Sequence, residues 1–139
     1  MKKINGLECI LLVDDDDATN FIHKMEIKKL NLDVHLEVVH NGKEALDYIT
    51  QQGKYAGTTY PQPGVILLDI NMPIMNGWEF IEAYGKLSGD RKAKIVIAML
   101  TTSINPDDEK RARANSELVE FMNKPLKEGV LKSLLERHY

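Results

Sequence analysis

Short apolar segments recur along the chain, and stretches of helical length separate them. Segments such as ILLV and IVIAML are nearly continuous and rich in β-branched residues, which is typical of parallel strands covered on both faces of a sheet. The pattern predicts five strands, at residues 9–13, 34–39, 65–68, 95–100 and 118–122.

The intervening stretches predict five helices. In the first, Ala18, Phe21, Ile22 and Met25 recur at helical spacing, so we expect them to form its buried face, with Asp16 or Asp17 as the N-cap. The other helices show asparagine caps or apolar stripes: Asn41 before Ala45, Leu46 and Ile49; Asn76 before Phe80, Ile81 and Tyr84; Asn105 before Pro106; and a last stripe of Leu126, Val130, Leu134 and Leu135. This alternation predicts the α/β class, with a doubly wound five-stranded parallel sheet flanked by five helices.

Size and charge exclude several classes of protein. The 139 residues match one domain, so we expect a single domain over residues 1–139. The net charge of -3 lacks the basic excess of nucleic-acid-binding proteins, and no apolar run reaches the ~18 residues of a membrane span, so neither nucleic acid nor a membrane is expected as a partner.

The single cysteine, Cys9, lies in a strand segment, which favours a buried thiol and a cytoplasmic location. The linker at 53–64 is interpreted as a surface insertion.

Polar side chains follow the ends of several predicted strands. The first strand runs into four aspartates at 14–17, the third into Asp69, the fourth into the Thr-Thr-Ser run at 101–103, and Lys124 closely follows the fifth. In open α/β sheets, ligands bind outside the carboxyl ends of the strands. We therefore expect these groups to share one crevice.

The acidic residues at these strand ends indicate a cation site. Asp14, Asp15 and Asp69 would be unfavourable together, because neighbouring carboxylates repel and burial removes their hydration. An all-oxygen ligand set favours a hard ion, and phosphate chemistry favours Mg²⁺ over Ca²⁺. Asp16 and Asp17 are interpreted as helix-capping residues instead.

Lys124 and Thr101 meet a second requirement. A phosphoryl group on Asp69 would need positive charge and hydrogen-bond donors, which Mg²⁺, the lysine ammonium and the threonine hydroxyl supply together. Attack of a carboxylate on phosphorus gives an acyl phosphate, a known kind of covalent intermediate. The sequence thus predicts phosphoryl chemistry at Asp69.

Four motifs resemble the receiver domain of two-component response regulators over nearly the whole chain: LLVDDDD, VILLDINMPIMNG, IAMLTTS and FMNKP. The most specific part is Asp69-Ile70-Asn71-Met72-Pro73 with Gly77 beyond it. The resemblance implies a flavodoxin-like receiver fold, with Asp69 as phosphoacceptor. It also implies Mg²⁺ ligands and phosphoryl-binding residues: Asp15, Asp69 and the backbone carbonyl of Asn71 directly, Asp14 through water, and Thr101, Thr102 and Lys124 at the phosphoryl group.

The resemblance further implies partners and a switch. A histidine kinase or histidine phosphotransfer protein would donate the phosphoryl group, since none of His23, His35, His40 and His138 is expected at a suitable strand end. Phosphorylation would draw Thr101 inward and let Phe121 rotate, repacking the face of the fourth helix, fifth strand and fifth helix, where a downstream effector would bind. The chain is thus expected to act as a stand-alone, chemotaxis-regulator-like response regulator rather than an enzyme. Its oligomeric state stays open.

Two departures and three alternatives accompany this interpretation. Thr102 is bulkier than the residue usual there and could narrow access to Asp69, and the linker at 53–64 is longer than the corresponding loop of compact receivers. Phe121 also lacks the hydroxyl of the tyrosine often found at its position. A haloacid-dehalogenase-like phosphatase would need an aspartate where Asn71 stands, and its metal-binding acids would follow the lysine rather than precede it. In a flavodoxin-like electron carrier, the four aspartates would repel the phosphate of FMN. A receiver-like scaffold that is never phosphorylated would not need Asp15, Asp69, Thr101 and Lys124 together.

Overall fold

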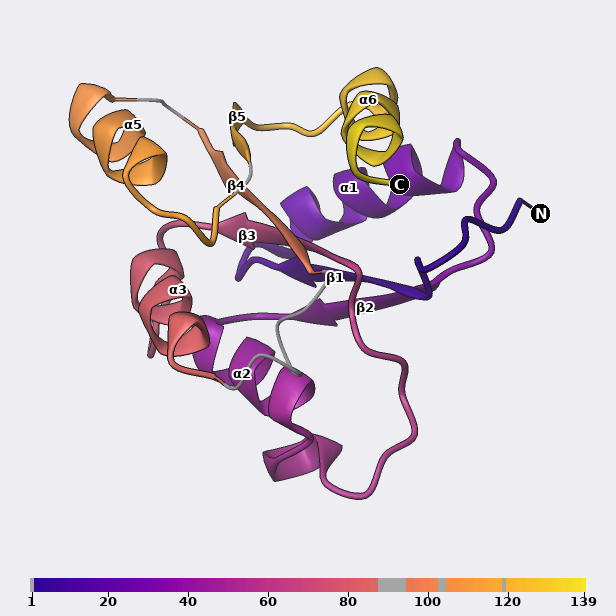
Figure 1. The fold of residues 1–139 in the computed structure, drawn as a ribbon, viewed down its shortest axis with the longest axis horizontal. Helices are drawn as coiled ribbons and strands as arrows, with labels where there is room; N and C mark the ends of the chain where they lie inside the picture. The colour runs from indigo at the N-terminus through magenta and orange to yellow at the C-terminus, as the bar shows by residue number, and fades with distance from the viewer. Residues whose placement is uncertain (1, 88–94, 103–104, 119) are drawn as a thin grey trace.

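The computed structural model describes residues 2–87, 95–102, 105–118 and 120–139. Within them, one parallel sheet has the strand order β2-β1-β3-β4-β5 (Figure 1). Its strands are β1 (Cys9–Val13), β2 (His35–Val39), β3 (Val65–Asp69), β4 (Val96–Thr101) and β5 (Glu120–Asn123). The chain moves from β1 outward to β2 and then returns to β3 on the other side of β1. The order therefore reverses between β1 and β3, where a ligand crevice is expected.

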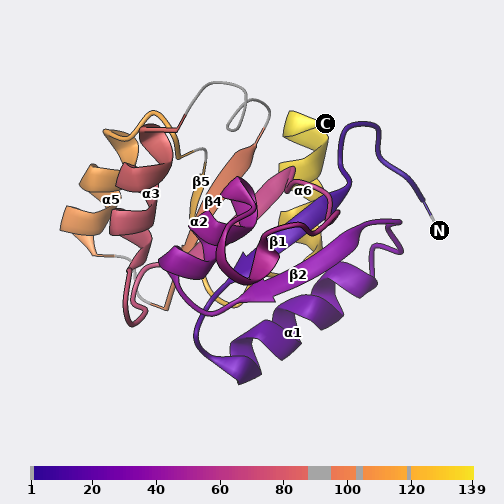
Figure 2. The ribbon, with the colours of Figure 1, turned by 90° about the horizontal axis from the view of Figure 1, so that it is seen from below.

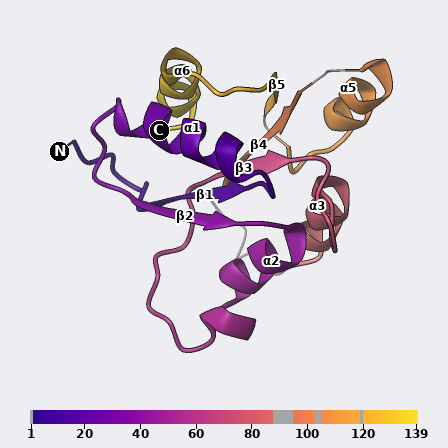
Figure 3. The same ribbon diagram turned by 180° about the vertical axis from the view of Figure 1, so that it is seen from behind.

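Helices cover both faces of this sheet. Figures 1 and 3 show α1 (Asp17–Lys28) and α6 (Glu128–His138) on one face, with α2 (Gly42–Thr50) and α3 (Gly77–Gly85) on the other. Figure 2 shows α5 (Pro106–Arg113) beside α3. The described residues thus form five strands and five α-helices in this arrangement, which confirms the predicted fold class.

The sequence identified most helix starts correctly. Asn41, Asn76 and Asn105 each accept a hydrogen bond from a backbone N–H in the first turn of the following helix. Asp16 caps α1 in the same way, whereas Asp17 is the first residue of that helix. These side chains satisfy donors that a helix leaves unpaired at its N-terminus.

The core consists of two apolar layers, one on each face of the sheet. β1 is buried along its whole length, as is β4, and alternate side chains of both strands enter opposite layers. The layer under α2 and α3 includes Cys9, whose thiol is buried as expected; burial raises its pKa to about 11. A sheet covered on both faces explains why the strand segments are continuous rather than alternating.

The predicted buried face of α1 is wrong. Phe21, Ile22 and Met25 are 63%, 44% and 49% exposed, and the residues of α1 that are buried are Asn20, His23 and Ile27. The two buried polar side chains each hydrogen-bond to the backbone of another segment, Asn20 to Asp14 and His23 to Leu126. Those bonds satisfy the amide nitrogen of Asn20 and one ring nitrogen of His23, and an apolar spacing rule does not consider such bonds.

A smaller correction concerns α6. Leu126, Leu134 and Leu135 are buried as predicted, but Val130 is 44% exposed and Leu131 is buried in its place. Val130 lies in the first turn of the helix, where the chain has just left β5. The buried face of α6 therefore includes Leu131 rather than Val130.

The linker at 53–64 is more ordered than a simple surface insertion. It opens with a short 3-10 helix, η1 (Gly53–Tyr55), and the buried ring of Tyr55 packs edge-on against Tyr48 of α2. The ring of Tyr60 stacks on His35 of β2, and the hydroxyl of Tyr48 donates to the carbonyl of Pro61. This linker thus covers the outer side of α2 and β2 with aromatic contacts.

Among the described residues, no helix is both long enough and apolar enough to cross a membrane.

Candidate functional site

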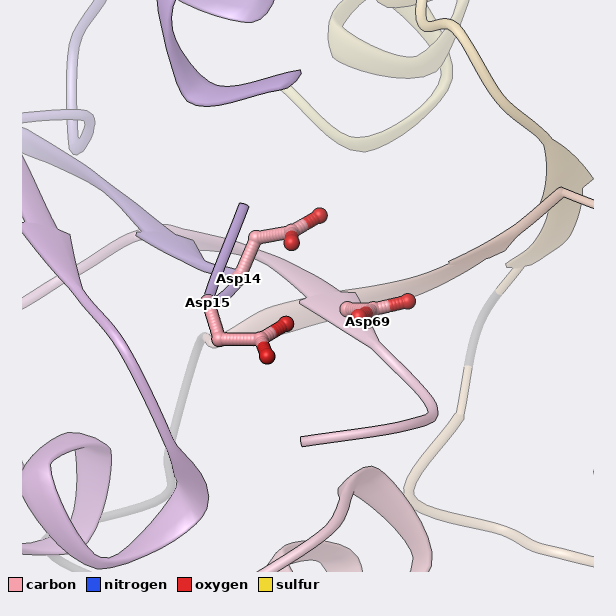
Figure 4. Close-up of side chains that lie close together, drawn as sticks. All are labelled: Asp14, Asp15 and Asp69. Atoms are coloured by element: carbon pink, nitrogen blue, oxygen red, sulfur yellow. The ribbon is translucent and has the colours of Figure 1, made fainter. Parts of the chain in front are cut away.

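Three carboxylates meet at the carboxyl edge of the sheet. Asp14 and Asp15 follow the last residue of β1, and Asp69 ends the neighbouring strand β3 (Figure 4). One oxygen from each lies within 4.8 Å of the others. Asp14 is buried, Asp69 is half-buried and Asp15 is exposed, so the group opens to solvent on the side of Asp15. The sequence prediction that these three aspartates come together is confirmed.

Lys124 reaches this group from the end of β5. Its Nζ lies 2.6 Å from Oδ2 of Asp14 and 2.9 Å from Oδ1 of Asp69, and its side chain is 9% exposed. One ammonium faces three carboxylates, which leaves an excess of two negative charges. That excess equals the charge of one divalent cation, and the all-oxygen donor set suits a hard ion such as Mg²⁺.

The pKa values of Asp69 and Lys124 are shifted by burial and by neighbouring charges. Burial raises the pKa of Asp69 above its ordinary value and the charge of Asp14 adds to this rise, although the hydrogen bond from Lys124 opposes it. For Lys124, burial alone would lower the pKa, but its contacts with Asp14 and Asp69 outweigh burial and raise the pKa overall. The lysine therefore remains charged beside carboxylates that compete for it.

Thr101 and Thr102 occupy the end of the neighbouring strand. Thr101 is the last residue of β4 and is buried, and its carbonyl accepts a hydrogen bond of 2.7 Å from the N–H of Lys124. Thr102 comes next and is exposed, while Ser103 lies outside the described residues. Leu100 pairs with Asp69 in the sheet, so Thr101 stands one step beyond the carboxylate along the next strand.

The loop after Asp69 is closed tightly against the backbone of β3. Asn71 lies two positions beyond Asp69 and is exposed. Metal binding by its backbone carbonyl stays a prediction. The N–H of Gly77 donates to the carbonyl of Ile70, and a Cβ at Gly77 would lie only 2.4 Å from the carbonyl oxygen of Asp69. Glycine is therefore required at the point where the loop returns to the phosphoacceptor candidate.

The family of this chain follows from comparison with known proteins. The model of the response regulator receiver domain matches residues 10–136. The chain belongs to the response regulator receiver domain family.

Relatives support the same family. The response regulator Rcp1 of Synechocystis is 36% identical over 104 residues, which are 75% of this chain and 68% of Rcp1. A two-component response regulator from Cytophaga hutchinsonii superposes with a TM-score of 0.81 at 30% identity, covering 94% of this chain and 96% of that one. A Mn²⁺-bound form of Rcp1 superposes with a TM-score of 0.74 at 27% identity, covering 93% and 90%.

Helix α1 of this receiver domain supports the site in a way that the sequence did not reveal. The Nδ2 of Asn20 donates to the carbonyl of Asp14 over 2.9 Å, and the N–H of Leu126 donates to Nε2 of His23 over 3.1 Å. Leu126 lies two residues beyond Lys124, across a cis peptide bond at Lys124-Pro125. α1 therefore holds the backbones that carry both Asp14 and Lys124. The sequence signal for this supporting role was the presence of two polar residues, Asn20 and His23, among the apolar residues of the helix.

Phe121, the predicted switch residue, lies in β5 of the receiver domain. It pairs with Met99 of β4 and is partly buried against the apolar layer of α2, α3 and α5. This position lies on the strand between α5 and α6, within the face predicted to change. Rotation of its ring remains a prediction.

His40 is a histidine of the receiver domain that lies beside a strand end. His40 directly follows β2, whereas the clustered carboxylates follow β1 and end β3, so the expectation that no histidine lies at a suitable strand end stays a prediction. Its ring lies 3.5 Å from Asp17 and 3.7 Å from Glu44, and it is half exposed. His40 therefore contacts Asp17 and Glu44, whereas Lys124 contacts Asp14 and Asp69. His23 has the packing role that was expected.

Proposed function

We propose that the chain is a phosphoryl-accepting signalling switch, a single-domain response regulator that takes a phosphoryl group from a phosphohistidine onto Asp69. The observation that carries this proposal is the contact of one buried ammonium, Lys124, with two of three clustered carboxylates. That arrangement leaves an uncompensated charge suited to Mg²⁺ and places a cation beside the candidate nucleophile.

In this proposal each residue has a defined task. An oxygen of Asp69 attacks phosphorus in line with the phosphorus–nitrogen bond of the donor, which breaks and leaves its electron pair on the imidazole nitrogen. Lys124 shifts its contact from Asp69 to a phosphoryl oxygen, and the hydroxyl of Thr101 donates to another.

Asp15, Asp69 and the carbonyl of Asn71 would hold Mg²⁺ directly, and Asp14 through water. When bound, the ion neutralises charge on the transferring group. Water later hydrolyses the acyl phosphate on Asp69.

The proposed output is binding in trans. Phosphorylation would favour one of two arrangements of Thr101 and Phe121, and α5, β5 and α6 would present the altered face to a downstream effector. The donor would be a histidine kinase or a histidine phosphotransfer protein. We place this activity in the cytoplasm, where such partners act.

The decisive experiment measures phosphorylation by a small donor. With Mg²⁺ and phosphoramidate, we expect one acid-stable, base-labile phosphoryl group per chain, and none in Asp69→Asn. Asp33→Asn, which removes an exposed carboxylate outside the site, serves as the matched control and should be labelled like the wild type. Labelling of Asp69→Asn would move the acceptor elsewhere, and no labelling of the wild type would favour a scaffold.

A second measurement uses the single tryptophan. Trp78 follows Gly77, which packs on the carbonyl of Asp69, and Arg111 of α5 lies 4.6 Å from its ring centroid. Beryllofluoride with Mg²⁺ should therefore change Trp78 fluorescence in the wild type but not in Asp69→Asn. Repeated turnover of a generic phosphate ester would instead indicate the phosphatase alternative.

A further inference from the structure

Ile74 combines two unfavourable features on the loop that follows Asp69. Its side chain is 81% exposed, and its backbone has a φ of 68°. The N–H of Met75 donates to the carbonyl of Pro73 over 2.7 Å, which closes a three-residue γ-turn with Ile74 at its centre. The form of this turn with a positive central φ is rare and strained, and a β-branched residue is an outlier in that region.

Neighbouring contacts hold the turn without help from the isoleucine side chain. The carbonyl of Met75 accepts a hydrogen bond of 2.9 Å from the N–H of Gly42, and a Cβ at Gly42 would lie 2.7 Å from Cγ of Met75. The loop is thus seated on the first residue of α2. Glycine or asparagine at position 74 would adopt the same φ more readily. Folding therefore gives no reason for isoleucine there, and strained residues of this kind occur often at functional sites.

The position of the turn beside Asp69 suggests a function for the exposed isoleucine. The loop leaves Asp69 and returns to it, since Gly77 packs on the carbonyl of Asp69. Figure 4 shows the first part of this loop leaving the carboxylate group. From Ile70 to Gly77 the sequence contains no charged side chain. A macromolecule that brings a phosphohistidine in line with Asp69 must cover the surroundings of this carboxylate, whereas a small donor needs only the carboxylate itself.

We propose that Ile74 is an apolar contact residue for the protein phosphodonor, and that it helps to determine which phosphohistidine protein the chain accepts. The inference rests on the proposed function of Asp69. The partner surface that it fits is apolar and lies beside the donor histidine. The proposal gives Ile74 no role at the metal or the phosphoryl group, so a change of this residue should affect transfer from a protein and not transfer from a small molecule.

The test compares two donors on the full chain. Ile74→Asn removes the apolar side chain and suits the positive φ, so its urea unfolding midpoint should rise above that of the wild type. Its labelling rate with Mg²⁺ and phosphoramidate should stay within about twofold of the wild type. Phosphotransfer from a phosphorylated histidine phosphotransfer domain should become at least about tenfold slower. The donor for this assay is chosen from a panel of histidine phosphotransfer domains as the one that phosphorylates the wild type fastest.

Ile74→Val is the matched control. It keeps the branched apolar side chain and the strain, so both transfer rates and the unfolding midpoint should resemble those of the wild type. The proposal is overturned if Ile74→Asn accepts the phosphoryl group from the protein donor as fast as the wild type. It is also overturned if the wild type is labelled by phosphoramidate but by no phosphotransfer domain. If phosphoramidate does not label the wild type, the proposed function itself fails.

Discussion

Helices α1 and α3 begin close to the same carboxylates, yet they bury opposite kinds of residue. α3 turns its apolar side chains into the core, and Phe80 is completely buried. α1 leaves Phe21 63% exposed and buries Asn20 and His23 instead. Both helices have an N-cap side chain and a comparable apolar spacing, so local sequence rules do not distinguish them.

The difference shows what each helix contributes. α3 stabilises the fold by removing apolar surface from water, whereas the inner face of α1 supplies hydrogen bonds to the segments after β1 and β5. Those two segments carry Asp14 and Lys124, which contact each other in the site. α1 therefore contributes less apolar burial and more to the placement of the charged groups.

The largest expected effect concerns the apolar residues of the two helices. Phe80→Ala in α3 should lower the free energy of unfolding by about 3–5 kcal/mol, because it leaves a cavity in a packed layer. Phe21→Ala in α1 should change it by no more than about 0.5 kcal/mol, because this ring is mostly in water. Urea unfolding followed by circular dichroism measures both. Equal losses would mean that α1 is packed like α3, and the comparison would fail.

A smaller effect is expected from the buried polar side of α1. His23→Ala removes the acceptor of the Leu126 N–H and should destabilise the protein by about 1–3 kcal/mol, since a buried donor is left without its partner. His40→Ala, at a half-exposed histidine, is the control and should lie within about 0.5 kcal/mol of the wild type. The same unfolding measurement applies. If both alanine variants were equally stable, the bond to Leu126 would have no structural importance.

Much of the fold could be predicted from the sequence because burial on both faces leaves a strong signal. The run at Cys9–Val13 coincides with β1, and the other strands agree within two residues. Asn41, Asn76 and Asn105 were recognised as caps because their side chains satisfy the first N–H groups of a helix. The grouping of Asp14, Asp15, Asp69 and Lys124 was also predictable, because the carboxyl ends of parallel strands share one edge.

What the sequence did not reveal depends on contacts between distant residues. The inward turn of Asn20 and His23 depends on backbone groups at Asp14 and Leu126, and no local spacing contains that information. The positive φ of Ile74 likewise depends on the seat that Gly42 provides for Met75. Isoleucine would argue against such a turn if only local preference were considered.

The smallest effect that we expect is a pH dependence carried by α1 and absent from α3. Burial lowers the pKa of His23 below its ordinary value, although the charge of Asp14 opposes this. The unfolded chain therefore binds a proton at His23 near pH ~6.5, where the folded chain does not yet bind it. Stability from this residue is thus complete above that pH and decreases as the pH falls below it.

His23→Gln keeps an oxygen that can accept from Leu126 but cannot titrate, so it separates the proton from the hydrogen bond. Between about pH 7.5 and about pH 5.5, the wild type should lose more unfolding free energy than His23→Gln, by less than the loss from His23→Ala at neutral pH. Parallel pH profiles for the wild type and His23→Gln would show that His23 is protonated as easily in the folded protein as in the unfolded chain. The buried side of α1 would then be hydrated, and its contrast with α3 would be smaller than the contacts of Asn20 and His23 imply.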